Sequence, residues 1–224
     1  DDITNVTILK IGGSIITDKD ANDGAANYDE IERIAGEISK HQDRLIIVHG
    51  AGSFGHPQAK KYALTEKFDA KGALITHESV KTLNRIVVES LKNAGVDAVG
   101  VHPMGSTVSE NGRISQMFLD NIHLMLDNGF VPVLHGDVVM DTKLGTSVLS
   151  GDQIVPYLAV QLGGARIGIG SAKDGVLDDK GDTIPTITSS NFKDIKKYIG
   201  SSESTDVTGG LLGKVGALLK LCET

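Results

Sequence analysis

Short apolar runs alternate with longer segments of helical periodicity along most of the chain. Apolar residues in the longer segments recur every three or four positions, which predicts amphipathic helices. The short runs are apolar throughout, as in strands buried on both faces. The pattern predicts strands at 6–11, 44–48, 98–102, 130–134 and 165–169, and helices at 28–40, 77–93, 114–127, 152–162 and 209–221.

This alternation predicts an α/β fold in which helices cover both faces of a mainly parallel sheet. Ligands of such sheets bind beyond the carboxyl ends of the strands. Four predicted strands end in Gly-rich or Gly-Asp loops, so we expect these loops to converge on one site. The polar stretch 189–204 is expected to be a mobile connection.

Composition narrows the function classes. The 224 residues suffice for one large α/β domain or two lobes that share a sheet. The net charge of −7 and the lack of a Lys/Arg block argue against nucleic-acid binding. No apolar run approaches the roughly 20 residues of a membrane span, and no secretory signal is seen. The single cysteine, Cys222, fits a reducing compartment, so we expect a cytoplasmic protein.

The first candidate site begins where a lysine interrupts an apolar strand. Lys10 is followed by Ile11, the pair Gly12-Gly13 and Ser14, with Lys19 close behind. Adjacent glycines let backbone N–H groups approach an anion, and a lysine beside them can neutralise a transferring phosphoryl group. A snorkelling lysine before a plain turn is the simpler alternative.

The second candidate site is the run HGAGSFGH at 49–56. Gly50, Gly52 and Gly55 match the dinucleotide pattern G-x-G-x-x-G, which leaves an NAD-dependent oxidoreductase open. No acidic residue closes the next strand at the expected distance of about 20 residues. A helix is expected to open here with Pro57 in its first turn, so His56 is interpreted as a donor to a phosphate rather than a surface histidine.

Three further motifs are weaker. After His135-Gly136, Asp137 could hold a lysine ammonium or a metal, or only cap a turn. The segment 150–152, Ser-Gly-Asp, is typical of a simple helix cap. The segment 205–214 fails as a Walker A loop, but its Gly-Gly helix start and Lys214 could still face an anion.

The order of these motifs is more specific than any one of them. ILKIGGSIITDK, HGAGSFGH, the strand-end HGD, SGDQIVPYLA and DVTGGLLGK resemble the amino acid kinase superfamily over nearly the whole chain. The histidine of GSFGH is similar to that of the branch that phosphorylates isopentenyl phosphate to isopentenyl diphosphate with ATP. The resemblance implies a three-layer αβα sandwich with a mainly parallel open sheet, ATP with Mg²⁺, and a homodimer.

The resemblance also implies two lobes. Residues 1–149 would bind the phosphate acceptor and dimerise, and 150–224 would bind ATP. The family continues with another strand and helix, so the ATP lobe is expected to be incomplete at its C-terminus. The family's nucleotide loop commonly reads TDVDGV, whereas 170–176 lacks one acidic residue and gains Lys173.

Roles come to this chain residue by residue from the resemblance. The expected catalytic residues are Lys10, Lys19, His56 and Lys214. The expected acceptor-binding residues are Ala51, Gly52, His56 and Gly136. The expected ATP-binding residues are Lys10, Gly12, Gly13, Ser14, Gly52, Asp152, Ser171, Asp174, Gly175, Gly210 and Lys214. No protein metal ligand is assigned.

Alternatives to this activity stay open. Another phosphate-acceptor kinase of the superfamily, such as a uridylate kinase, would share most of these motifs. A carboxylate acceptor fits the histidine less well. A nucleotide-sensing regulatory module would keep the fold without turnover, and the oxidoreductase interpretation predicts NAD(H) binding.

Overall fold

The computed structural model describes residues 6–18, 20–21, 24–163 and 165–170. The chain divides into two compact units, Asp1–Gly170 and Ser171–Thr224, and every described element belongs to the first. The expected helix at 209–221 and the expected connection at 189–204 lie outside the described residues. The division into lobes after residue 149 stays a prediction.

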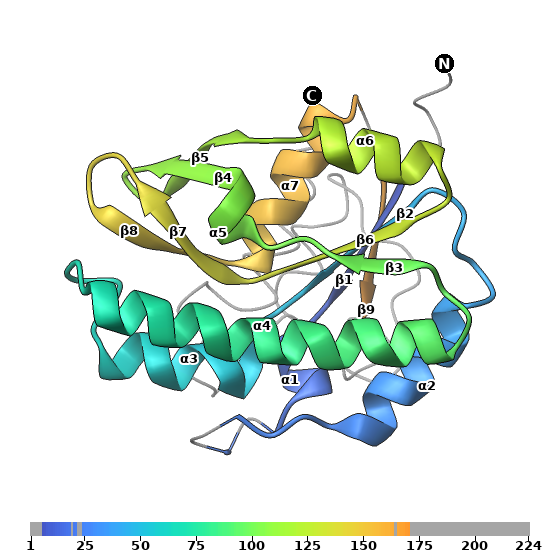
Figure 1. Cartoon of the computed structure of the whole chain (residues 1–224), viewed down its shortest axis with the longest axis horizontal. Coiled ribbons are helices and arrows are strands. Elements are labelled where there is room, and N and C mark those ends of the chain that lie inside the picture. The colour runs from blue at the N-terminus through green and yellow to red at the C-terminus, as the bar shows by residue number, and fades with distance from the viewer. Residues whose placement is uncertain (1–5, 19, 22–23, 164, 171–224) are drawn as a thin grey trace, which may run out of the picture. The chain divides into compact units, whose positions relative to one another are not determined.

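Five parallel strands form the main sheet, as the sequence predicts (Figure 1). They are β1 (Thr7–Ile11), β2 (Leu45–His49), β3 (Ala98–Gly100), β6 (Val131–His135) and β9 (Arg166–Gly170). Their spatial order is β3-β6-β2-β1-β9. All residues of β2 and β6 are buried, because helices cover both faces of the sheet.

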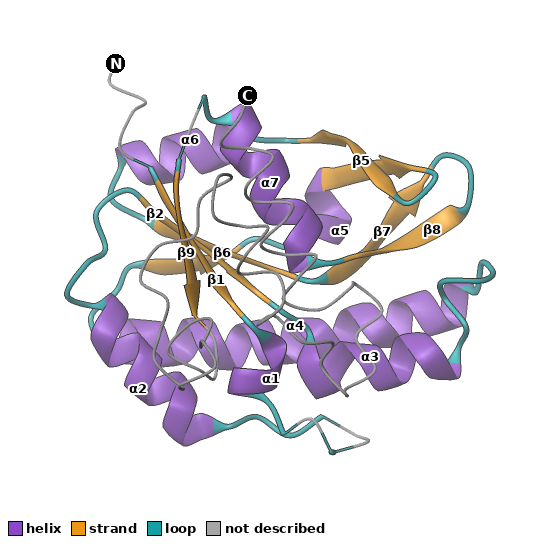
Figure 2. Ribbon diagram, turned by 180° about the vertical axis from the view of Figure 1, so that it is seen from behind, coloured by secondary structure: helices purple, strands orange, loops and turns teal. Residues whose placement is uncertain are grey.

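Two layers of helices enclose this sheet (Figures 1 and 2). One face is covered by α1 (Gly13–Ile16), α2 (Tyr28–Ile38), α3 (Gly52–Lys61) and α4 (Ala70–Asn93). The other is covered by α6 (Asp120–Asp127) and α7 (Gly151–Gln161). The result is the predicted αβα arrangement, and its main core lies between the sheet and the four-helix layer.

The single helix predicted at 114–127 is wrong in its first part. Arg113–Met117 forms a strand, β5, that pairs antiparallel with β4 (Thr107–Glu110), and α6 begins only at Asp120. Asn111 and Gly112 connect the two strands with positive φ angles of 51° and 78°. Asn-Gly is the preferred pair for such a hairpin turn. The turn reverses the chain, and pairing with β4 outweighs the helical spacing that follows.

A second hairpin was also not predicted. It joins β7 (Asp137–Asp141) to β8 (Gly145–Leu149), and the four strands form a smaller sheet in the order β5-β4-β7-β8. The Asp141 carboxylate accepts hydrogen bonds from the N–H groups of Asn111 (3.0 Å), Gly112 (2.7 Å), Lys143 (2.9 Å) and Leu144 (2.9 Å). One side chain therefore holds the turns of both hairpins.

Two helices differ from prediction at their N-terminal ends. Helix α4 begins at Ala70 rather than residue 77, and the Asp69 carboxylate caps it by accepting from the Gly72 N–H at 2.7 Å. Pro57 is the sixth residue of α3 and lies inside the helix rather than in its first turn. A short helix, α5 (Pro103–Ser106), precedes β4. Within the described residues, no helix has both the length and the apolar character needed to span a bilayer.

Candidate active site

The loops after β1 and β2 meet backbone to backbone. A Cβ atom on Gly13 would overlap the Gly52 nitrogen, and one on Gly50 would lie 2.6 Å from the Gly13 nitrogen. Neither position can therefore carry a side chain without a shift of backbone. The Gly50 N–H also donates to the Ile11 carbonyl at 2.9 Å. The two glycine motifs form one backbone surface at the carboxyl edge of the sheet, which confirms their predicted convergence.

Thr17 fastens these two loops together. Its hydroxyl donates to the Gly13 carbonyl (2.7 Å) and accepts from the Ser53 N–H (3.1 Å). Gly52 opens α3 with a φ of +50°, and a Cβ there would collide with the Thr17 hydroxyl. Only glycine combines this backbone angle with this close approach. The N-termini of α1 and α3 are thus held side by side.

An ion pair between a buried lysine and a half-buried aspartate lies near the end of β1. Lys10 is only 8% exposed, and its Nζ lies 2.7 Å from Oδ1 of Asp152 in the first turn of α7. A Cβ on Gly151 would lie 3.3 Å from the Lys10 Cε, so the glycine leaves room for the lysine stem. The pair brings together two residues expected to bind ATP. Their contact was not predicted. Ser150 occupies the N-cap position of α7, but its side chain makes no capping hydrogen bond, so the interpretation of 150–152 as a simple side-chain cap is wrong.

Gly136 closes the other side of the glycine surface. Its N–H donates to the His49 carbonyl at 3.0 Å. A Cβ on Gly136 would lie 3.4 Å from the Ala51 nitrogen, so a side chain would stand directly beside that N–H group. No acceptor for the Ala51 N–H occurs among the described residues. Ala51 and Gly136, both expected to bind the acceptor, are therefore neighbours with a free donor between them.

The remaining predicted residues fall into two groups. Gly12 caps α1 and Ser14 is exposed in its first turn. His56 is exposed on α3 and has no hydrogen-bond partner within the described part of the chain. Six predicted residues lie outside the described residues: Lys19, Ser171, Asp174, Gly175, Gly210 and Lys214.

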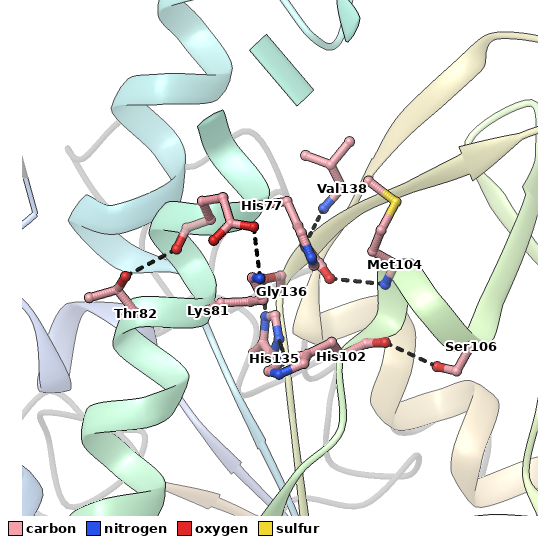
Figure 3. Close-up of polar contacts among 11 residues, drawn as sticks. His77, Lys81, Thr82, His102, Met104, Ser106, His135, Gly136 and Val138 are labelled. Carbon is pink, nitrogen blue, oxygen red and sulfur yellow. Dashed lines mark hydrogen bonds and ion pairs between the residues drawn. The ribbon is translucent and has the colours of Figure 1, made fainter. Parts of the chain in front are cut away.

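Four histidines without an assigned role form a cluster beside these loops. This histidine cluster consists of His49, His77, His102 and His135. His49 and His135 stack with ring centroids 5.7 Å apart, and His102 Nδ1 lies 2.8 Å from His135 Nε2 (Figure 3). The sequence signal was the repeated His-Gly pair at the ends of two apolar strands.

Asp137 contacts the histidine cluster and not, among the described residues, the lysine ammonium that the sequence suggested. Its carboxylate accepts from His77 Nδ1 (2.8 Å), from the Val138 N–H (2.8 Å) and from the Met104 N–H (3.0 Å). The three donors His77, Met104 and Val138 belong to α4, α5 and β7, respectively, and Figure 3 shows the three residues. Within the described residues it contacts no lysine. Asp152, not Asp137, holds the site lysine.

Burial controls the protonation of the cluster. It lowers the pKa of His49 to about 3 and that of His135 to about 4, with further lowering from neighbouring histidines. Burial also lowers the pKa of His102. Moving an imidazolium out of water is costly, so His49 and His135 are neutral at physiological pH.

A separate cavity of about 440 Å³ opens beside α4 and the end of β3. Its lining includes Lys81, Arg85 and His102, and none of the predicted site residues. In the described part of the chain, no three His, Cys, Asp or Glu side chains are grouped to hold a metal ion.

The strand order argues against the dinucleotide alternative. In that fold the strand after the glycine loop and helix lies next to the first strand and ends in an acidic residue. Here the next strand is β3, which β6 separates from β2. Val101 and His102 follow β3. The GAGSFG match is therefore not a dinucleotide fingerprint.

Comparison with known proteins identifies the family of this chain. The amino acid kinase family matches residues 5–224. The chain therefore belongs to the amino acid kinase family.

Individual relatives narrow the class. An isopentenyl phosphate kinase of Haloferax volcanii is 40% identical over 226 residues, 97% of this chain and 88% of that protein. One of Methanothermobacter thermautotrophicus is 38% identical over 231 residues, 96% of this chain and 86% of that protein. A crystal structure of an isopentenyl phosphate kinase superposes with a TM-score of 0.75 at 35% identity, covering 87% of this chain and 85% of that one. Within the family, the chain groups with the isopentenyl phosphate kinases.

Proposed function

We propose that this protein transfers the γ-phosphoryl group of ATP to isopentenyl phosphate, giving isopentenyl diphosphate and ADP. The observation that carries the proposal is the Lys10–Asp152 pair at the point where the glycine loops of β1 and β2 meet. The pair provides a cation at the same edge of the sheet as the glycine backbone surface and the start of α3, and these features together suit a chain of phosphates. The relatives' names supply the acceptor.

Charge is the main obstacle to this reaction, because two anions must approach each other. An oxygen of the acceptor phosphate attacks the γ-phosphorus in line, and the bond to the ADP oxygen breaks. The acceptor phosphate is already largely deprotonated near pH 7, so the chain needs no strong base. Lys10 and the backbone N–H groups lower the repulsion, and His56 donates to the acceptor phosphate. Catalysis then rests on positioning and electrostatics.

Asp152 acts through Lys10. A lysine stem is flexible, and a carboxylate at 2.7 Å fixes its ammonium at the end of β1 before any ligand arrives. Mg²⁺, when bound with ATP, supplies further charge neutralisation on the phosphates. Within the described residues no three His, Cys, Asp or Glu side chains are grouped to hold a metal ion, so Mg²⁺ would be held mainly by the phosphates and waters that accompany ATP.

A substrate panel tests the activity. The protein is incubated with ATP, MgCl₂ and one acceptor: isopentenyl phosphate, UMP, N-acetylglutamate or carbamate. We expect ADP and isopentenyl diphosphate in equal amounts, measured by a coupled ADP assay and ³¹P NMR. Preference for UMP would replace the proposal with a uridylate kinase. ATP binding without turnover of any acceptor would support the regulatory module.

A lysine variant tests the site. Lys10→Met should lower kcat on the order of 10²-fold or more, because one charged donor to the phosphates is lost. Lys40 offers a matched control, since it is exposed and pairs with Glu37 on the surface of α2. Lys40→Met should leave kcat unchanged. Equal effects of the two substitutions would contradict the assignment of Lys10.

Other parts of the proposal rest on the resemblance. They are a homodimer formed through residues 1–149, ATP binding by residues 150–224, and a cytoplasmic location. Size-exclusion chromatography with light scattering tests the dimer. The roles of Lys19, Lys214 and the other site residues outside the described part remain predictions, and the same kinetic assay tests each of them.

A further inference from the structure

The two strands that border the acceptor loops end in the same way. His49 closes β2 before Gly50, and His135 closes β6 before Gly136. The two histidines are register partners in neighbouring strands, and both are 0% exposed. Each ring turns back on its own loop: Nδ1 lies 2.9 Å from the Gly50 carbonyl oxygen and 2.8 Å from the Gly136 carbonyl oxygen, respectively.

The hydrogen-bond network assigns the ring protons. A carbonyl oxygen can only accept, so Nδ1 of each ring carries the hydrogen. Nε2 of His49 then accepts from the Asn84 amide at 3.0 Å, and that amide also donates to the Val133 carbonyl at 3.2 Å. Nε2 of His135 accepts from His102 Nδ1 at 2.8 Å (Figure 3). Both rings are neutral, and both nitrogens of each ring are bonded.

These contacts fix the orientation of the following peptide groups. In a trans peptide the carbonyl and the next N–H point in opposite directions, and no described peptide bond is cis. With the Gly50 carbonyl held by the His49 ring, the Ala51 N–H points away from that ring. A Cβ on Gly136 would lie 3.4 Å from the Ala51 nitrogen, so the space that this glycine leaves open adjoins that nitrogen, and no described residue accepts from its N–H.

We propose that His49 and His135 are positioning residues for the phosphate acceptor. Their Nδ1–H groups lock the Gly50 and Gly136 carbonyls so that the Ala51 N–H faces the acceptor phosphate in the gap left by Gly136. The proposal rests on the proposed function and adds two residues to it. Glycine loops are flexible, and a buried neutral donor fixes them without placing a charge in the core.

Substitutions of His49 by asparagine and by glutamine distinguish a positioning role from a role in which the side chain only fills space in the core. The asparagine amide nitrogen takes the place of Nδ1, so His49→Asn keeps the donor to Gly50 and loses the acceptor for Asn84. Glutamine reaches the place of Nε2, so His49→Gln keeps the acceptor for Asn84 and loses the donor to Gly50. Glutamine is also closer to histidine in volume, so a purely structural role favours His49→Gln.

We expect the asparagine variant to be more active than the glutamine variant, although glutamine is closer to histidine in volume. His49→Asn should keep kcat/KM for isopentenyl phosphate within about threefold of wild type, because the donor is retained. His49→Gln should lower it about 10- to 100-fold, because the released Gly50 carbonyl no longer fixes the Ala51 N–H toward the acceptor phosphate, and a hydrogen bond to a charged group is worth about that factor. The same order is expected for the His135 pair. The exposed His41 supplies the control, and neither of its substitutions should matter.

Two results would overturn the proposal. One is a glutamine variant as active as the asparagine variant, with wild-type transfer intact. The other needs no variant: ¹⁵N imidazole shifts of the wild type that place the proton of His49 or His135 on Nε2, or that show an imidazolium at pH 6. A wild type that transfers nothing to isopentenyl phosphate, yet shows Nδ1–H tautomers, would instead refute the proposed function.

Discussion

His56 follows Gly52, the first residue of α3, in the sequence of this helix, and its imidazole is exposed. Within the described residues it has no hydrogen-bond partner, so the ring is available to a ligand. His56→Ala should lower kcat with isopentenyl phosphate on the order of 10²-fold, because a donor to the transferring oxygens is removed. ATP affinity, measured by calorimetric titration, should stay near the wild-type value.

The control for His56 is another exposed histidine. His41 follows α2, and His41→Ala should leave both kcat and ATP affinity unchanged. Unchanged turnover in His56→Ala would remove this residue from the site. A large loss of ATP affinity in that variant would assign His56 to the nucleotide instead of the acceptor.

Single residues were predictable where the signal is local. Gly12, Gly13, Gly50 and Gly52 were recognised because glycine clusters after apolar runs mark backbone that turns or approaches closely. The Lys10–Asp152 contact was not predicted, since it depends on where α7 docks against β1. The histidine cluster was missed for the same reason: register between β2 and β6 creates it, and no spacing within either segment reports that register.

Replacing glycine by alanine at two helix positions should change the free energy of unfolding in opposite directions. Gly52→Ala should destabilise the protein by about 2 kcal/mol or more, because φ is +50° and the added Cβ collides with Thr17. Gly36→Ala, within α2, should stabilise it by about 0.5–1 kcal/mol, since nothing lies within 4 Å of the added atom. Urea unfolding of both variants measures the difference.

The Gly52 comparison also reports on the site. Gly36 is remote from the loops, so Gly36→Ala should keep wild-type kcat, whereas Gly52→Ala should lose activity even at temperatures where it is fully folded. An active and stable Gly52→Ala protein would mean that the loops after β1 and β2 do not pack as described.

Asp141 links the two hairpins of the smaller sheet, and its ionisation sets a pH window. Burial alone would raise the pKa of this carboxyl, but four backbone N–H donors outweigh burial and hold the pKa well below its usual range. The charged form is therefore favoured by folding. Its contribution is complete above the unfolded pKa, near 3.8, and is lost as the pH falls through the lower folded value.

Replacement of Asp141 tests this window. Asp141→Asn should cost about 2 kcal/mol at pH 7, because one amide oxygen cannot satisfy four donors. The difference from wild type should be constant between pH 8 and 5, and should narrow only below the unfolded pKa. Denaturant unfolding across this range gives both values. A difference that already disappears at pH 6 would show that another group is responsible.

Elements were predicted where periodicity was long and undisturbed, as in α2 and the buried strands. The smaller sheet was not, because β4, β7 and β8 mix polar with apolar residues. Their stability comes from pairing between segments far apart in sequence, and from the Asp141 contacts. Asn111-Gly112 was the one local signal for a hairpin, and the helical spacing after it concealed the turn.

The order of the strands in the main sheet is a property of the whole molecule and cannot be predicted from any one segment. Alternating strands and helices predict a parallel sheet, but not that β6 lies between β2 and β3. That insertion brings His135 beside His49 and places Gly136 against Ala51. It also rules out the dinucleotide interpretation of a motif that looked plausible by itself. Topology, and not the motif, decides what the glycine loop can bind.

The buried histidines make the stability of the whole molecule depend on pH. A histidine in the unfolded chain takes up a proton near pH 6.5, whereas folding lowers the pKa to about 3 for His49 and about 4 for His135. Above pH 6.5 neither state is protonated, and stability is independent of these groups. Between pH 6.5 and 4 only the unfolded state is protonated, so each histidine removes about 1.4 kcal/mol per pH unit.

Urea unfolding at pH 7.5, 6.5, 5.5 and 4.5 should therefore show a plateau followed by a steep fall. His49→Asn removes one of the two groups while keeping the donor to Gly50. Its fall should be shallower by about 1.4 kcal/mol per pH unit, and His41→Asn, at an exposed histidine, is the control substitution. A wild type equally stable at pH 7.5 and 5 would mean that His49 and His135 are protonated in the folded protein. In that case the neutral donors proposed for the two glycine loops could not exist.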